Sequence, residues 1–301
     1  MLTRLVTPAP LRLLNTFSKH QQPVLKPPQL SRKMSTFTLP KSVFNPSLYH
    51  RARDIWFKDQ PLSKRSVDIS VLKRWFLLAG DDRDAFDSVC ARNFSEALDA
   101  ISPERFPNPS AEPFLREIED ILEGRNADER VAARGKDEAA WTALSLVILL
   151  DQMSRNLFRT SEGLRKVYAH YDVISKGFVD ALMAPKSPLG RIDEYPLWKD
   201  SIGYRHWFYM PWMHSEDPEA HERLETILGK LSEEEKEEEV RAFIASEVDA
   251  ARKHKDIIDR FGRYPHRNGA LGRESTEEEK QFLRSGGDTF GVKQDHEDKA
   301  T

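Results

Sequence analysis

The stretch that most constrains the fold is an apolar run at residues 143–150, followed at once by a dense group of polar residues. Only Ser145 interrupts the run, so a helix here is apolar on nearly every side and has to be buried on most of them. Convincing period-two alternation occurs nowhere over five or more residues, whereas apolar residues recur at helical spacing from Pro46 onward. The sequence therefore predicts an all-α fold of about nine or ten helices, packed as antiparallel pairs joined by short loops.

The charge is unevenly distributed along the 301 residues. Residues 1–53 carry nine Lys and Arg and no Asp or Glu, so of the formal net charge of −3 the remaining residues carry −12. Residues 1–33 combine basic, hydroxylated and apolar side chains without any acid, which is the composition of a mitochondrial transit peptide. We expect this segment to direct the protein to the mitochondrial matrix. The alternatives are a disordered tail and a cytoplasmic form that starts at Met34.

A single helical domain is predicted over residues 47–292. Residues 34–46 contain the prolines of a linker, and residues 293–301 form a polar tail. No apolar run reaches the roughly 20 residues that a membrane-spanning helix needs, so no membrane span is expected. The single cysteine, Cys90, falls on an apolar helical stripe, which favours a packed residue over a nucleophile.

Capping residues mark several predicted helix starts. The predicted caps are Asp217 or Ser215 with Pro218 at the first helical position, Thr160 or Ser161, a capping box of Ser232 with Glu235, and Ser275 or Thr276 with Glu278 or Glu279.

Three segments hold many polar groups beside apolar anchors, namely residues 151–159, 214–217 and 254–274. Between Arg252 and Arg273 seven Lys and Arg stand against two Asp, a local charge of +5 within an acidic body. Such a patch either binds an anion or neutralises acids elsewhere in the fold. Because the body is acidic, we do not expect nucleic acid to be the partner.

These segments supply the candidate site residues. The acid-base candidates are Asp151, His214 and His266. The candidate ligand-binding residues are Gln152, Arg155, Asn156, Arg159, Glu216, Asp217, Arg260, Arg263, Arg267, Asn268 and Arg273. A metal site is disfavoured, because no ligand pair has the tight spacing of a helix-borne zinc site. Standard nucleotide-binding and serine-hydrolase motifs are missing, and the sequence leaves the cofactor unknown.

Three motifs carry a family resemblance. They are Leu-Leu-Asp-Gln-Met-Ser-Arg-Asn-Leu-Phe-Arg (149–159), Tyr-Met-Pro-Trp-Met-His-Ser-Glu-Asp (209–217), and the stretch from His254 through Arg-Phe-Gly-Arg-Tyr-Pro-His-Arg-Asn to Leu-Gly-Arg-Glu-Ser (271–275). In this order they resemble the domain of unknown function 924, a family common in bacteria, over about residues 50–292. The family usually has Phe-Pro where this chain has Met153-Ser154. The resemblance implies an all-helical fold similar to tetratricopeptide-repeat proteins, fits an organellar location, and implies no activity or catalytic residue.

Three hypotheses about function follow from the sequence. The first is a helical binding or scaffold protein, whose partner is a peptide, a protein or an anionic small molecule held at the polar residues. The second is an enzyme, a hydrolase or a group-transfer enzyme, that acts on a phosphorylated or carboxylated substrate and uses the arginines as anion clamps. The third is that the polar segments are purely structural and form a buried ion-pair network.

Overall fold

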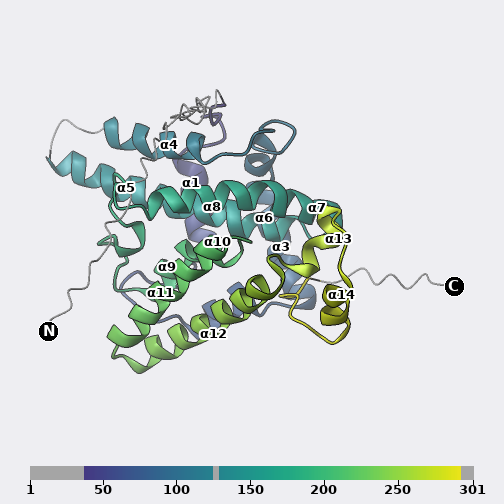
Figure 1. The fold of residues 1–301 in the computed structure, drawn as a ribbon. Helices are drawn as coiled ribbons and strands as arrows, with labels where there is room; N and C mark the ends of the chain where they lie inside the picture. Colours follow the sequence, from purple (N-terminus) through teal and green to yellow (C-terminus); the bar gives the residue numbers. More distant parts are fainter. Residues whose placement is uncertain (1–36, 125–128, 293–301) are drawn as a thin grey trace, which may run out of the picture. The chain divides into compact units, whose positions relative to one another are not determined.

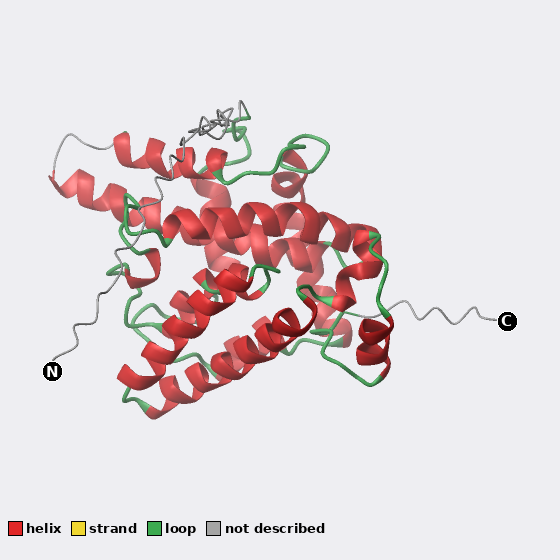
Figure 2. Cartoon of the chain, viewed as in Figure 1, coloured by secondary structure: helices red, strands yellow, loops and turns green. Residues whose placement is uncertain are grey.

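The structure is a computed structural model that describes residues 37–124 and 129–292. Within these ranges all regular structure is helical and no strand occurs (Figure 2). The described residues belong to one compact unit, and the predicted all-α fold is confirmed. The predicted transit peptide (1–33), the first residues of the predicted linker (34–36) and the predicted tail (293–301) lie outside the described residues.

The longer helices agree in number with the prediction, since nine of the described helices have eight residues or more. These are α1 (Pro46–Trp56), α2 (Ile69–Phe76), α3 (Gly80–Ala100), α4 (Glu112–Glu123), α5 (Glu129–Val147), α8 (Asp172–Leu182), α11 (Pro218–Glu234), α12 (Glu238–Phe261) and α14 (Glu277–Arg284). Short helical segments join them. Among the described residues, no helix is both long enough and apolar enough to cross a membrane.

The predicted buried helix lies at the centre of the domain. Helix α5 runs without a break into a π-helical turn, η1 (Ile148–Met153), and then into the short helix α6 (Ser154–Leu157). Every residue of η1 is buried, as the apolar run predicts. The neighbouring segment repeats this construction, because α7 (Ser161–Lys166) passes through a second π turn, η2 (Val167–Tyr171), into α8. Apolar residues recur at helical spacing through this segment, so the periodicity gave no sign of the π turn.

The segment before α1 is not a free linker. Phe44 is fully buried and Leu39 is 5% exposed, and both belong to the main hydrophobic core. Asn45 caps α1, because its side chain accepts hydrogen bonds from the backbone N–H groups of Ser47 and Leu48. Residues 41–45 between the two prolines form turns, and their buried side chains pack on the domain.

The aromatic segment of residues 202–213 fills the space between the central helices and the C-terminal half. It forms α9 (Ile202–Arg205), η4 (His206–Phe208) and α10 (Met210–Met213). Trp207, Phe208 and Tyr209 have no exposed surface. Helix α10 contacts both α8 and α11 (Figure 1), so this segment joins the two halves of the core.

Helices α11 and α12 pack side by side as a long antiparallel pair (Figure 1). Asp217 caps α11 by accepting from the backbone N–H of Glu219 at 3.0 Å, as predicted. The predicted capping box at Ser232 was wrong, because Ser232 lies inside α11 and α12 begins at Glu238. The Glu235 carboxylate instead closes the turn between the helices by accepting from the backbone N–H groups of the next two residues.

The chain then forms a compact C-terminal segment. Helix α12 ends at Gly262, whose φ of 68° a residue with a side chain adopts only with strain. The short η5 (Pro265–Arg267) and α13 (Asn268–Leu271) follow, and α13 lies against α7 (Figure 1). Thr276 and Glu279 form the predicted capping box at the start of α14. Helices α7 and α13 thus hold segment 254–274 next to the centre of the fold.

Candidate functional site

Asp151 and His214 form the first contact between two of the three polar segments. Nδ1 of His214 lies 2.9 Å and 3.0 Å from the two carboxylate oxygens of Asp151. The Asp151 side chain is 1% exposed and that of His214 is 15% exposed. Burial by itself raises the pKa of Asp151, but His214 and Arg155 outweigh it and hold the pKa below its usual value. The carboxylate is therefore charged and holds the imidazole in one orientation.

Arg155 carries the cluster from Asp151 to the next helix. Its guanidinium lies 3.3 Å from the carboxylate of Asp151, and it makes two contacts of 2.9 Å with the oxygens of Asp172 at the start of α8. Arg267 approaches the same carboxylate at 3.6 Å. The Arg267 guanidinium lies 4.4 Å from the ring centres of Tyr168 and Tyr264, a cation–π arrangement on both sides.

The third polar segment is attached through Glu216. Arg273 donates to both oxygens of Glu216, at 2.7 Å and 2.9 Å. The same carboxylate accepts from the backbone N–H of Tyr264 at 2.9 Å, and the Tyr264 hydroxyl donates to the backbone oxygen of Met213. All three polar segments therefore meet. We call Asp151, Arg155, Asp172, His214, Glu216, Tyr264, Arg267 and Arg273 the central polar cluster.

The two π turns explain how buried helices deliver charged groups to one place. Asp151 lies on η1, Tyr168 lies on η2, and Asp172 follows η2 directly. A π turn adds about one residue to a helical turn and so changes the direction in which the following side chains point. Such turns are frequent at functional sites, because they place a polar side chain where a regular helix would place an apolar one.

Two further histidines border the central polar cluster under an aromatic cover. The ring centres of His214 and His254 are 6.4 Å apart, and those of Tyr264 and His266 are 5.5 Å apart. Phe290 stacks on His254 at 3.6 Å and meets His266 edge-on at 5.7 Å. Burial lowers the pKa of His254 to about 3, and burial together with Arg267 and Arg273 lowers the pKa of His266 to about 3. Both rings are therefore neutral at pH 7.

Several predicted site residues lie outside the central polar cluster. Asn156 and Arg159 both donate to Asp87 of α3. Gln152 lies beside Asp151, to which its side-chain amide donates at 2.6 Å.

The remaining predicted site residues tie down helix ends. Asp217 caps α11 and pairs with Lys176 at 2.9 Å. The C-terminal pairs lie farther out, and they are Arg260 with Glu278, Arg263 with Glu279, and Asn268 with Ser275 and Glu279. These contacts fasten α14 and the chain around it.

The comparisons with known proteins agree with the motifs. A family model described as a bacterial protein of unknown function (DUF924) matches residues 52–287. This chain belongs to the DUF924 family. A solved structure, described as a protein of unknown function, ATU0120, from Agrobacterium tumefaciens, is 29% identical to the chain. The similarity covers 80% of this chain and 98% of that one, with a TM-score of 0.50. No curated protein matches the sequence.

The charges of the central polar cluster decide what this DUF924 protein can bind there. The carboxylates of Asp151, Asp172 and Glu216 stand against the guanidiniums of Arg155, Arg267 and Arg273, and each of these arginines contacts at least one of these acids. Arg263, the remaining candidate anion clamp, pairs with Glu279. An anionic ligand therefore has to displace a carboxylate from one of these arginines. From the surplus of basic residues in segment 254–274 alone, one would instead expect unpaired arginines.

Four residues in or beside the central polar cluster are missing from the candidates that the sequence supplied. Asp172 and Tyr168 looked like ordinary members of an amphipathic helix, although their spacing of four puts an acid directly beside a tyrosine on the buried face. Tyr264 and Phe290 looked like isolated aromatics in loops. Nothing in their spacing marks them, because each acts through chain segments distant in the sequence.

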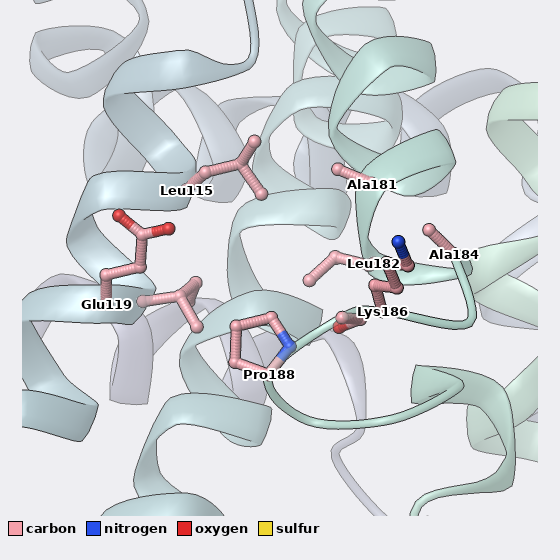
Figure 3. Close-up of a pocket in the computed structure, with 9 residues that line it drawn as sticks. Leu115, Glu119, Ala181, Leu182, Ala184, Lys186 and Pro188 are labelled. Carbon is pink, nitrogen blue, oxygen red and sulfur yellow. The ribbon is translucent and has the colours of Figure 1, made fainter.

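Metal binding and cavities complete the description of the site. Within residues 37–124 and 129–292, no three His, Cys, Asp or Glu side chains are grouped so that they could hold a metal ion together. A cavity of about 240 Å³ lies between α4 and the end of α8, beside the loop at Pro188. Figure 3 shows the residues that line it. Its walls are mainly apolar, with Glu119 and Lys186 as the charged groups, and none of its lining residues belongs to the central polar cluster.

Cys90 is confirmed as a packed residue. Its side chain is fully buried in the main core. Burial, together with the charge of Asp87, raises the pKa of the thiol to about 12. A thiol that stays protonated at pH 7 is a poor nucleophile.

Proposed function

We propose that this protein binds a small polar ligand at the edge of the central polar cluster, and that His214 exchanges a proton with it. The observation that carries the proposal is the contact of His214 Nδ1 with both oxygens of the buried Asp151 carboxylate. A carboxylate that holds one ring nitrogen fixes the tautomer and directs the other nitrogen outward, which is the arrangement of a general acid-base histidine.

The second ring nitrogen is available for this task. Among the described residues we find no hydrogen-bond partner for Nε2 of His214, and the side chain keeps 15% of its surface exposed. The neighbouring His254 and His266 are neutral, so they do not repel a positive charge that develops on His214. This favours the enzyme hypothesis, with Asp151 as the positioning residue and His214 as the group that touches the ligand.

The balance of charge restricts the ligand. A phosphate or carboxylate has to replace Asp172 or Glu216 at an arginine, which costs the existing ion pair. Arg267 nonetheless keeps one buried donor, Nε, without a hydrogen-bond partner among the described residues. A neutral polar ligand with one acceptor group fits these contacts better than a multiply charged anion. A peptide or protein partner in a groove between helix pairs stays a prediction from the sequence.

The purely structural hypothesis makes a competing claim about the same residues. The matched charges of the central polar cluster are what a network needs in order to fasten segment 254–274. The two hypotheses differ at His214, because a network that only stabilises the fold has no use for a half-buried imidazole whose outer nitrogen lacks a partner.

A thermal-shift screen separates the hypotheses. The full chain is tested against neutral polar, carboxylated and phosphorylated small molecules, beside the His214→Gln variant and a matched control, His50→Gln, at a half-exposed histidine. We expect a ligand that stabilises the wild type, by about 2.7 kcal/mol at a hundred times its Kd, and that has no effect on His214→Gln. A panel without a single hit, or a hit that survives in His214→Gln, contradicts the proposal.

We also propose a location in the mitochondrial matrix. The composition of residues 1–33 supports it, with six Lys and Arg and no acid. Sequencing the N-terminus of the protein from purified mitochondria tests the proposal, since import predicts a start near residue 34. An intact Met1 in that pool, or a protein found only in the cytosol, refutes it.

A further inference from the structure

A second group of polar residues lines another cavity and shares no residue with the central polar cluster. It surrounds a cavity of about 280 Å³ between the segment before α1, helix α1, helix α4 and helix α5. The lining residues are Lys41, Phe44, Asn45, Pro46, Tyr49, Glu117, Ile121, Glu138 and Thr142. We infer that this cavity is a binding site for a primary ammonium group carried on a short apolar chain.

The helices bring the lining together by regular spacing. Glu117 and Ile121 are four residues apart on α4, and Glu138 and Thr142 are four residues apart on α5, so each pair lies on one face of its helix. Helices α4 and α5 pack against each other (Figure 1). Each helix thus adds one carboxylate, and the two carboxylates line the same cavity.

The Glu117 carboxylate is already engaged. It is 6% exposed, accepts from the Tyr49 hydroxyl at 2.9 Å, and forms an ion pair with Lys41. Burial, with the adjacent carboxylate, raises the pKa of Tyr49, so its hydroxyl stays protonated and donates to Glu117. The oxygen of that hydroxyl keeps lone pairs that can accept from a ligand.

Two acceptors in the wall are available. The hydroxyl of Thr142 is buried, with the residue 1% exposed, and it has no hydrogen-bond partner among the described residues. The Glu138 carboxylate keeps 27% of its side-chain surface exposed, and its contact with His50 is long, at 3.9 Å. A buried hydroxyl without a partner costs free energy unless a ligand or water bonds to it.

Charge and shape decide the class of ligand. The lining has one cation, Lys41, against the carboxylates of Glu117 and Glu138, which leaves one negative charge for a ligand to balance. An ammonium group has three N–H donors and no acceptor, which matches the oxygens of Glu138, Thr142 and Tyr49. Phe44, Pro46 and Ile121 form the apolar part of the wall, so the body of the ligand is an alkyl chain.

The test compares three probes that each contain six carbons and differ in the polar group at the end. Hexylamine, 1-hexanol and hexanoate are titrated into the full chain by calorimetry at pH 7. We expect hexylamine to bind at least tenfold more tightly than 1-hexanol, and hexanoate not to bind. Equal affinities for the three probes, a preference for hexanoate, or no binding of hexylamine overturns the inference.

Two variants exclude an indirect effect. Glu138→Gln removes the available charge at a partly exposed position. Thr142→Val removes a hydroxyl that has no partner among the described residues, so we expect the folded protein to be as stable as the wild type or slightly more stable. Each is expected to weaken hexylamine binding about tenfold, which is about 1.4 kcal/mol. Glu119→Gln, on α4 but outside this cavity, is the matched control and is expected to bind as the wild type. Wild-type affinity in Glu138→Gln contradicts the assignment.

Discussion

The imidazole of His254 and the ring of Phe290 are stacked, with their centres 3.6 Å apart and an angle of 11° between their planes. Phe290 has a φ of 51°, which is uncommon for a residue with a side chain, and it is followed by Gly291 with a φ of 78°. Phe290 as a whole residue is 39% exposed. The C-terminal segment therefore bends sharply in order to lay an aromatic ring over two buried histidines beside the central polar cluster.

Phe290→Ala should uncover these histidines. Diethyl pyrocarbonate modifies neutral imidazoles, and the low pKa values of His254 and His266 keep both rings neutral. We expect several-fold faster modification of both in the variant, measured residue by residue by mass spectrometry. His50, whose side chain is 49% exposed, is the internal control and should react at the same rate in both proteins. Unchanged rates at His254 would show that Phe290 is not its cover.

Arg155→Ala should destabilise the fold strongly. The change leaves Asp151 and Asp172 buried without their main cation, and breaking a buried pair in this way costs about 3–5 kcal/mol. Arg159→Ala is the matched control, because its side chain is 49% exposed and its pair with Asp87 is worth about 1 kcal/mol or less. Urea unfolding measures both. Equal losses in the two variants would mean that the cluster at Arg155 is not a buried network.

The stability should fall as the pH drops below 6.5. His254 and His266 have a folded-state pKa of about 3 against a usual value of 6.5. Between these values the unfolded chain binds more protons than the folded one, so the free energy of unfolding is highest above pH 6.5 and decreases as the pH falls. Each histidine contributes up to about 1.4 kcal/mol per pH unit.

Carboxylates with a lowered pKa affect the stability at lower pH than these histidines do. Arg263 and the Thr276 backbone help to hold the pKa of Glu279 at about 2, so its contribution is lost only below its usual value of 4.5. Unfolding by urea at pH 7, 6 and 5 isolates the histidine effect. His254→Gln should reduce the slope in this range, and a wild-type stability that stays flat from pH 7 to 5 would contradict the low pKa values.

Phe44→Ala should show that the segment before α1 is part of the core. Phe44 is fully buried against Phe114, with ring centres 6.3 Å apart, and removing a buried phenylalanine costs about 3–5 kcal/mol. Phe76→Ala, at a ring that is 42% exposed, is the control and should cost clearly less. A loss of less than about 1 kcal/mol at Phe44 would restore the interpretation of this segment as a linker.

Local patterns in the sequence predicted much of the fold because helices are stabilised by near neighbours. The apolar run 143–150, the cap at Asp217 and the capping box at Thr276 are all determined by residues within four positions of each other. The local pattern gave a wrong prediction at Ser232. There the Glu235 carboxylate accepts from Arg65 and from the backbone of the turn instead of capping a helix with Ser232. A contact with a residue 170 positions away outweighed the local pattern.

The sequence alone determined that this protein is helical, that residues 143–150 are buried, and that three polar segments are rich in charged groups of opposite sign. Only the tertiary structure decided which charges meet. Asp172, Arg267 and Tyr264 join the central polar cluster because two π turns and the contact of α13 with α7 bring them together. Pairing between residues far apart in the sequence depends on how whole helices pack against each other. The spacing of residues within one helix does not determine that packing.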